Sequence, residues 1–136
     1  MKRINEFYDL AEFHSIPVMD VPLKGISAMA VCIGEKCAIG IDYEQSDSIE
    51  DEKVKLAHEL GHCETGSFYN KYSPVDLISK HEYRADKWAI KELLPKSEME
   101  EAMKNGYVEV WQLAELFEVT EEYVKKALWI YFDLLT

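Results

Sequence analysis

The segment LAHELGHCE, residues 56–64, places two histidines, His58 and His62, one helical turn apart. Side chains four residues apart share a helix face, about 5–6 Å from each other, so both imidazoles can reach one metal ion at the roughly 2.0–2.1 Å that zinc prefers. Glu59 directly follows the first histidine, and a carboxylate at that place can take a proton from a water molecule beside a metal ion. The pattern His-Glu-x-x-His therefore predicts a zinc hydrolase with Glu59 as its general base.

A catalytic zinc site needs a third protein ligand as well as an open position for water. The candidate is Glu82, in the segment KHEYRADKWAIKELLP at residues 80–95. Asp86 lies one turn along the same helix face, where it can accept a hydrogen bond from a ligand histidine and fix that imidazole. His81 is a competing third ligand, but it points about 100° away from Glu82 on a helix, so the two can hardly bind together. Without the upstream motif, Glu82 and Asp86 would be an ordinary charged helix face.

A peptide hydrolase also needs a hydrogen-bond donor for the oxyanion that forms during the reaction. The sequence offers four candidates and does not separate them: His81, Tyr43, Tyr69 and Tyr72. Tyr43 is expected at the end of a strand, and Tyr69 and Tyr72 in the loop between the two metal-binding helices. The tyrosines can equally be structural.

The hydrophobic pattern indicates the elements that must position these residues. Small and β-branched residues over 26–43 predict two strands around Gly34-Glu35-Lys36. Two prolines make residues 16–24 extended or edge-like. The helix that carries the histidines is expected to begin at the N-cap Ser48 and to stop by Gly66. Other helices are expected over residues 4–14, 78–94, 96–106, 110–117 and 121–135.

This order of elements predicts an α+β fold, in which a small antiparallel sheet packs on a mainly helical zinc-peptidase domain. We expect a single metallopeptidase domain over residues 1–136. Within it, residues 1–47 form an N-terminal helix and β-hairpin, residues 48–95 the metal-binding helices, and residues 96–136 a helical part that looks like a helix-turn-helix. The aromatic residues of this last part are expected in the core: Trp111, Phe117, Trp129, Tyr131 and Phe132.

Composition excludes several classes of protein. The formal net charge of −11 repels phosphate, so direct binding to nucleic acid is not expected. No apolar run approaches the roughly 18–20 residues of a membrane-spanning helix, and the first residues turn acidic too early for a signal peptide. The three cysteines, Cys32, Cys37 and Cys63, contain no Cys-x-x-Cys pair and are expected to be reduced thiols. The predicted location is the cytoplasm.

Two segments together, KLAHELGHCETGSFY and EYRADKWAIKELLP, resemble the ImmA/IrrE family of metallopeptidases. The family has LAHELGH on one helix and Glu-x-x-Ala-(Asp/Asn)-x-(Phe/Trp)-Ala on the next. The resemblance covers roughly residues 20–130 and implies a small intracellular protease of phages, mobile elements or bacterial chromosomes. It implies that His58, His62 and Glu82 bind zinc, that Glu59 is the base, and that the substrate is a helix-turn-helix repressor.

The expected function is therefore a cytoplasmic endopeptidase with one zinc ion per chain, preferred over manganese or iron, that cuts a helix-turn-helix repressor and relieves repression. The strand Ala38–Asp42 could pair with an extended substrate. The alternative is a non-catalytic, zinc-stabilised module that sequesters a repressor without cutting it, although such a module would not need Glu59. A DNA-binding regulator is disfavoured by the acidic charge.

Overall fold

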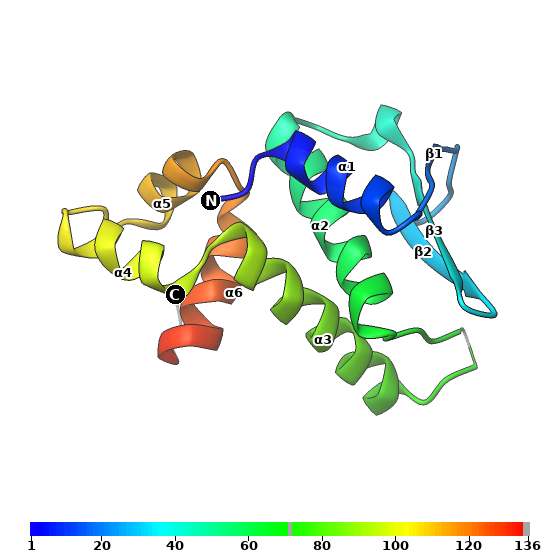
Figure 1. Cartoon of the computed structure of the whole chain (residues 1–136). Helices are drawn as coiled ribbons and strands as arrows, with labels where there is room; N and C mark the ends of the chain where they lie inside the picture. Colours follow the sequence, from blue (N-terminus) through cyan, green and yellow to red (C-terminus); the bar gives the residue numbers. More distant parts are fainter. Residues whose placement is uncertain (71, 135–136) are drawn as a thin grey trace.

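The computed structural model describes residues 1–70 and 72–134 and confirms the α+β fold (Figure 1). Its elements follow the chain as α1 (Ile4–Phe13), β1 (Val18–Asp20), β2 (Ala28–Ile33), β3 (Lys36–Ile41), the 3-10 helix η1 (Tyr43–Gln45), α2 (Ile49–Thr65), α3 (Val75–Leu93), α4 (Lys96–Lys104), α5 (Val110–Phe117) and α6 (Glu121–Phe132). In Figure 1, α2 and α3 lie side by side. The sheet and α1 lie beyond α2 as seen from α3, and the helices α4, α5 and α6 lie at the C-terminal end of α3.

The helix α2, which carries the histidine pair, begins and ends where its sequence predicts. The Ser48 hydroxyl accepts a hydrogen bond of 3.1 Å from the backbone N–H of Asp51, which satisfies one of the free donors of the first turn. Gly66 ends the helix with a φ of 65°, a left-handed conformation that glycine adopts without steric cost. The side chains of Leu56 and Leu60 are fully buried, so the helix is fixed against the core along its length.

The sheet is mixed, not wholly antiparallel as expected. β2 and β3 form the predicted hairpin, with Ile33 opposite Lys36. β1 pairs in parallel with β3, and the strand order in the described residues is β1-β3-β2. The parallel pair arises because the chain continues past β1 to form β2 and then returns between the two as β3. The proline-bounded segment thus forms a short edge strand, as expected, but its orientation was not predicted.

The helix α3 begins at Val75, three residues before the predicted start at Ile78. Pro74, at the N-cap, has a φ of −58°, and its carbonyl accepts hydrogen bonds from the backbone N–H groups of Leu77 and Ile78. Proline suits the start of a helix because its φ is already helical and its missing N–H would have no helical partner there. Pro74 was expected to lie in the loop before this helix, but it marks the start of α3.

Close packing of α2 against α3 explains a glycine in the middle of α2. A Cβ placed on Gly61 would lie 2.5 Å from the carbonyl oxygen of Ala85 in α3. Ala85 and Ala89 are both fully buried, so small residues on both helices let the two backbones approach. The cost of about 1 kcal/mol for glycine within a helix is offset by this contact, which brings the predicted ligands of the two helices together.

The C-terminal helices share one hydrophobic core with α1, the sheet and α2. Phe117 of α5 is 3% exposed and belongs to this core, but Trp111 and Trp129 are 55% and 47% exposed, so their predicted burial is wrong. Amphipathic helices at a surface leave one face outside the core, and these two indoles lie on that face. The buried ammonium of Lys53 in α2 donates a 3.0 Å hydrogen bond to the carbonyl of Phe117 and joins α2 to the end of α5.

Core residues come from all three predicted segments, 1–47, 48–95 and 96–136. The single domain and its boundaries stay predictions. Within residues 1–70 and 72–134, none of the helices combines the length and the apolar composition that a membrane crossing requires.

Candidate metal centre

The two histidines of α2 present the same ring atom, Nε2, to one point. Their ring centroids lie 4.8 Å apart with the planes nearly perpendicular. His58 Nδ1 is hydrogen-bonded to Asp86 Oδ1 at 2.7 Å, and His62 Nδ1 to the backbone carbonyl of Ser67 at 2.5 Å. An acceptor at Nδ1 keeps a proton there, so Nε2 is the nitrogen that can bind a metal ion once its own proton is displaced.

Glu82 reaches this point from α3. Its Oε2 lies 3.0 Å from His58 Nε2, and its Oε1 lies 3.0 Å from His62 Nε2. One ligand atom of each of the three residues lies within 4.8 Å of the others. Two imidazole nitrogens and one carboxylate oxygen are a donor set that zinc accepts, with room left for a fourth ligand. The structure thus brings together the three residues predicted as ligands, and the set fits a zinc ion.

The charges of this cluster are strongly coupled. Burial alone would lower the pKa of His58, but hydrogen bonds with Asp86 and Glu82 outweigh it and raise the pKa to about 10. The pKa of His62 is also raised, because hydrogen bonds to Glu82 and Ser67 outweigh its burial. The two imidazoles hold the pKa of Glu82 far below its usual range. Glu82 therefore stays ionised, as a metal ligand must be.

Asp86 lies where the sequence predicts, one turn beyond Glu82, and its carboxylate supports His58. Burial would raise the pKa of Asp86, but the bond to His58 and the nearby ammonium of Lys126 lower it. The carboxylate also accepts hydrogen bonds from Tyr123 and Lys126 of α6. Sequence reasoning missed these two contacts, since nothing in the pattern of α6 indicates which face meets α3.

Glu59 is 8% exposed and lines two cavities that meet at the cluster. Burial raises the pKa of its carboxyl above the ordinary value, against the lowering effect of His58 and His62. A raised pKa makes a carboxylate a stronger base at neutral pH. The chemistry available is therefore proton transfer at the point where the two cavities join.

The two cavities, of about 410 and 500 Å³, extend from the cluster in different directions. The first continues between β2 and α6, and Tyr123 and Lys126 line it. The second continues along β2 toward the loop that contains Phe68 and Tyr69. Both share His58, Glu59, Glu82 and Ala28 as lining residues, so the cluster lies at the middle of one cleft beside strand β2.

The four candidate oxyanion donors lie in different surroundings. The Tyr69 hydroxyl donates a 2.7 Å hydrogen bond to Glu82 Oε1, so Tyr69 belongs to the cluster. The His81 ring stacks on Tyr69 with centroids 6.4 Å apart, but His81 is outside the ligand cluster of the described residues. Tyr43 instead shares a hydrogen bond of 2.7 Å with the Tyr8 hydroxyl, between η1 and α1. Tyr72 is 83% exposed and, within the described residues, is not among those that line the two cavities.

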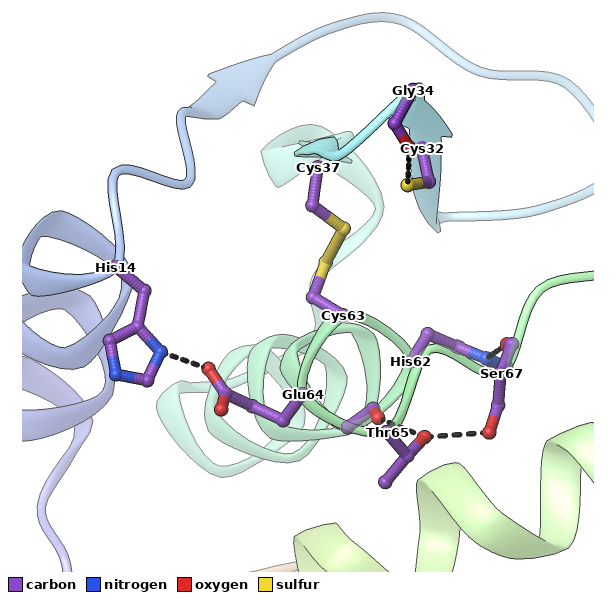
Figure 2. Close-up of a disulfide and its surroundings, with 10 residues drawn as sticks. His14, Cys32, Gly34, Cys37, His62, Cys63, Glu64, Thr65 and Ser67 are labelled. Carbon is purple, nitrogen blue, oxygen red and sulfur yellow. Dashed lines mark hydrogen bonds and ion pairs between the residues drawn. A yellow bond between two sulfur atoms is a disulfide. The ribbon is translucent and has the colours of Figure 1, made fainter.

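The cysteines contradict the prediction of reduced thiols. Figure 2 shows a disulfide between Cys37 of β3 and Cys63 of α2, the residue directly after His62. Among the described residues Cys32 remains a free, exposed thiol. The prediction failed because cysteines 26 residues apart show no local pattern, and their Cα atoms meet only when β3 packs on α2. The cysteines therefore no longer support the predicted reducing compartment.

Comparison with known proteins matches this site to one family. The model of the IrrE N-terminal-like domain, Peptidase_M78, matches residues 35–128. This range contains β3 and the whole ligand cluster and reaches into α6. No curated protein sequence matches the chain. The match covers most of the chain and confirms the predicted resemblance: the chain belongs to the IrrE N-terminal-like family of peptidases.

Proposed function

We propose that the protein is a zinc-dependent endopeptidase that cuts an intracellular regulatory protein, a helix-turn-helix repressor. The observation that carries this proposal is the convergence of His58, His62 and Glu82 at the middle of a cleft, with the buried carboxylate of Glu59 beside them. Membership of a peptidase family agrees with it. A zinc-stabilised binding module would need the three ligands but not a base with a raised pKa.

The proposed roles follow from the surroundings of each side chain. His58, His62 and Glu82 would hold zinc, which when bound polarises a peptide carbonyl and acidifies water. Glu59 takes the proton of the attacking water and delivers it to the leaving nitrogen, for which its raised pKa is suited. Asp86 keeps the His58 ring in one orientation through the Nδ1 hydrogen bond.

Tyr69 is the proposed donor to the oxyanion, because its hydroxyl already lies in the cluster. Replacing Tyr69 by phenylalanine is expected to lower kcat by roughly tenfold or more and to leave zinc content unchanged. The matched control is Tyr72→Phe, which removes the same hydroxyl from the same loop outside the two cavities. Equal activities of the two variants would show that Tyr69 is not the donor.

Substrate backbone is proposed to pair with β2, not with the strand Ala38–Asp42 as the sequence suggested. That prediction is wrong because β3 is the central strand and is paired on both sides, with β1 and β2. β2 lies at the edge of the sheet and lines both cavities. An edge strand offers free backbone groups to an extended peptide and so holds it without reading its sequence.

Charge supports a repressor as the partner. A DNA-binding protein carries a basic surface, and a net charge of −11 is complementary to it. The same charge argues against direct binding of this chain to DNA. Since a repressor works inside the cell, this substrate requires that the protein act in the cytoplasm.

The test is incubation of the zinc-loaded protein with purified helix-turn-helix repressors encoded near its own gene, followed by mass spectrometry. The proposal expects cleavage at a defined bond and at least a hundredfold slower cleavage by Glu59→Gln with zinc retained. Cleavage by Glu59→Gln at the wild-type rate would contradict the mechanism. A stable stoichiometric complex with intact repressor would instead support the binding module.

A further inference from the structure

Two side chains of α6 hold the carboxylate of Asp86, which also bonds to His58. The Tyr123 hydroxyl donates a 3.0 Å hydrogen bond to Asp86 Oδ1, the same oxygen that is bonded to His58 Nδ1. The Lys126 ammonium donates a 3.1 Å hydrogen bond to Asp86 Oδ2. With both oxygens engaged, the carboxylate cannot turn about its bond to Cβ without losing a hydrogen bond.

The two side chains are themselves held in place. Tyr123 is 7% exposed, and its ring packs in the core of the C-terminal helices. The Lys126 ammonium lies 4.9 Å from the centre of the Tyr123 ring, which favours a cation. It also lies 3.4 Å from Glu122 Oε1 one turn earlier on α6. The support of Asp86 is therefore built into the helix and does not depend on a flexible loop.

We propose that Tyr123 and Lys126 are positioning residues of the metal centre, acting on His58 through Asp86, so that α6 sets how tightly the site binds zinc. This inference rests on the proposed function, since it needs a zinc site. It gives the C-terminal helices a role other than the packing in the core that their sequence indicates.

The physical reason is the dependence of a ligand histidine on its acceptor. A carboxylate at Nδ1 fixes the ring and increases the basicity of Nε2, and losing such an acceptor costs about 10- to 100-fold in metal affinity. Asp86 is largely buried, with 16% of its side chain exposed, so its charge needs a counterion. Removing Lys126 would let the carboxylate shift toward solvent and away from His58.

The experiment measures the zinc dissociation constant by competition with a chromophoric chelator. Lys126→Gln and Tyr123→Phe are each expected to weaken zinc binding by about tenfold, at the lower end of the effect expected for Asp86→Asn. Lys126→Arg should restore most of the affinity, since it keeps the charge and the donor. The matched control is Lys125→Gln, which removes the same charge from the preceding, exposed residue and should bind zinc like the wild type.

A double-mutant cycle separates positioning from general stability. If Lys126 acts through Asp86, Lys126→Gln should weaken binding no further in an Asp86→Asn protein. With cobalt in place of zinc, the visible absorption bands should shift in Lys126→Gln, as they report the ligand geometry. The melting temperature of the chelator-treated variants shows how much of any loss is structural.

The inference is overturned if both variants bind zinc as tightly as the wild type. It is also overturned if the losses in Asp86→Asn and Lys126→Gln simply add, or if Lys125→Gln weakens binding as much as Lys126→Gln. Should Tyr123→Phe fail to fold, the Lys126 variants and the cycle decide alone. A wild-type protein that binds no zinc overturns the proposed function together with this inference, whereas zinc bound equally by all variants overturns this inference only.

Discussion

His58 and His62 are equivalent in the sequence motif but are supported differently in the fold. The Nδ1 acceptor of His58 is a carboxylate from α3, and that of His62 is the backbone carbonyl of Ser67, just after α2. A carboxylate raises imidazole basicity more than a neutral carbonyl does. His58 is therefore the candidate ligand whose proton would compete most strongly with a metal ion.

This competition predicts that zinc affinity depends on pH. The protein residues alone give His58 a pKa of about 10, so at neutral pH it carries a proton that zinc must displace. Affinity should rise with pH until the pKa of His58 is reached, by about tenfold per pH unit for each displaced proton. The measurement is the zinc dissociation constant from about pH 6 to pH 8, obtained by competition with a chelator. The zinc affinity of the chelator is corrected for the chelator's own protonation at each pH. An affinity independent of pH would contradict the assigned charge state of His58.

At this level the sequence predicts well which candidate ligands lie together, and poorly which side chains support them. The spacing of His58, His62 and Glu59 on one helix fixes their relation before any tertiary structure exists. Glu82 and Asp86 could be proposed because one turn separates them on a second helix. Tyr69 could not be chosen over Tyr43 or Tyr72, because a loop has no periodicity from which to deduce where a side chain points.

Strand β2 is positioned so that its outer edge faces the cleft. The backbone N–H of Asp42 donates a 2.9 Å hydrogen bond to the carbonyl of Ser27, which begins the β2–β3 ladder. Hydrogen-bonded and non-hydrogen-bonded pairs alternate along an antiparallel ladder. The backbone groups of Met29 and Val31 are therefore the ones that bond to β3. The N–H groups of Ala28 and Ala30 then point away from β3, at the strand edge that lines the two cavities.

Proline at Ala30 is therefore expected to weaken substrate cleavage much more than folding. It removes one outward N–H and no bond of the β2–β3 ladder, at an edge where proline is tolerated. We expect KM to rise by about tenfold, the effect of one lost hydrogen bond of about 1.4 kcal/mol, with a small change in melting temperature. The matched variant Val31→Pro removes a ladder bond and should lower the melting temperature. Equal effects of the two prolines on stability would contradict the assigned strand edge.

Two features could not be derived from the sequence: the order of the strands and the contacts of α6. The physical reason is the same for both. Local patterns define an element and its buried face, but pairing between elements depends on the whole fold. Pro17 and Pro22 correctly indicated an edge, and Ser48 and Gly66 correctly indicated the ends of α2. That β1 would lie parallel to β3 has no local signal.

Across the molecule, the disulfide joins the sheet to α2, the helix that carries the histidine pair. The bond between Cys37 and Cys63 closes a loop with a sequence separation of 26 residues, and such a loop restricts the unfolded chain. Neither cysteine belongs to the ligand cluster of the described residues. The disulfide therefore stabilises the fold that carries the site without forming part of the site.

Replacing Cys37 by serine is expected to lower the free energy of unfolding by roughly 3 kcal/mol and to leave zinc stoichiometry unchanged. The measurements are denaturant unfolding and zinc content of protein purified without reductant. Cys32→Ser is the matched control, since that thiol is exposed and free. A thiol titration of the unfolded, unreduced wild type should find one thiol, that of Cys32. Three titrating thiols, or equal destabilisation by the two serines, would contradict the bond.

The most direct test of the account is the zinc content of the purified protein, measured by elemental analysis in the wild type, Glu82→Ala and His81→Ala. The account predicts about one zinc ion per wild-type chain, the same content in His81→Ala, and loss of most of the zinc in Glu82→Ala. Zinc kept by Glu82→Ala and lost by His81→Ala would assign the third ligand to His81. A wild-type protein without zinc, even after zinc is added back, would contradict the metal centre itself.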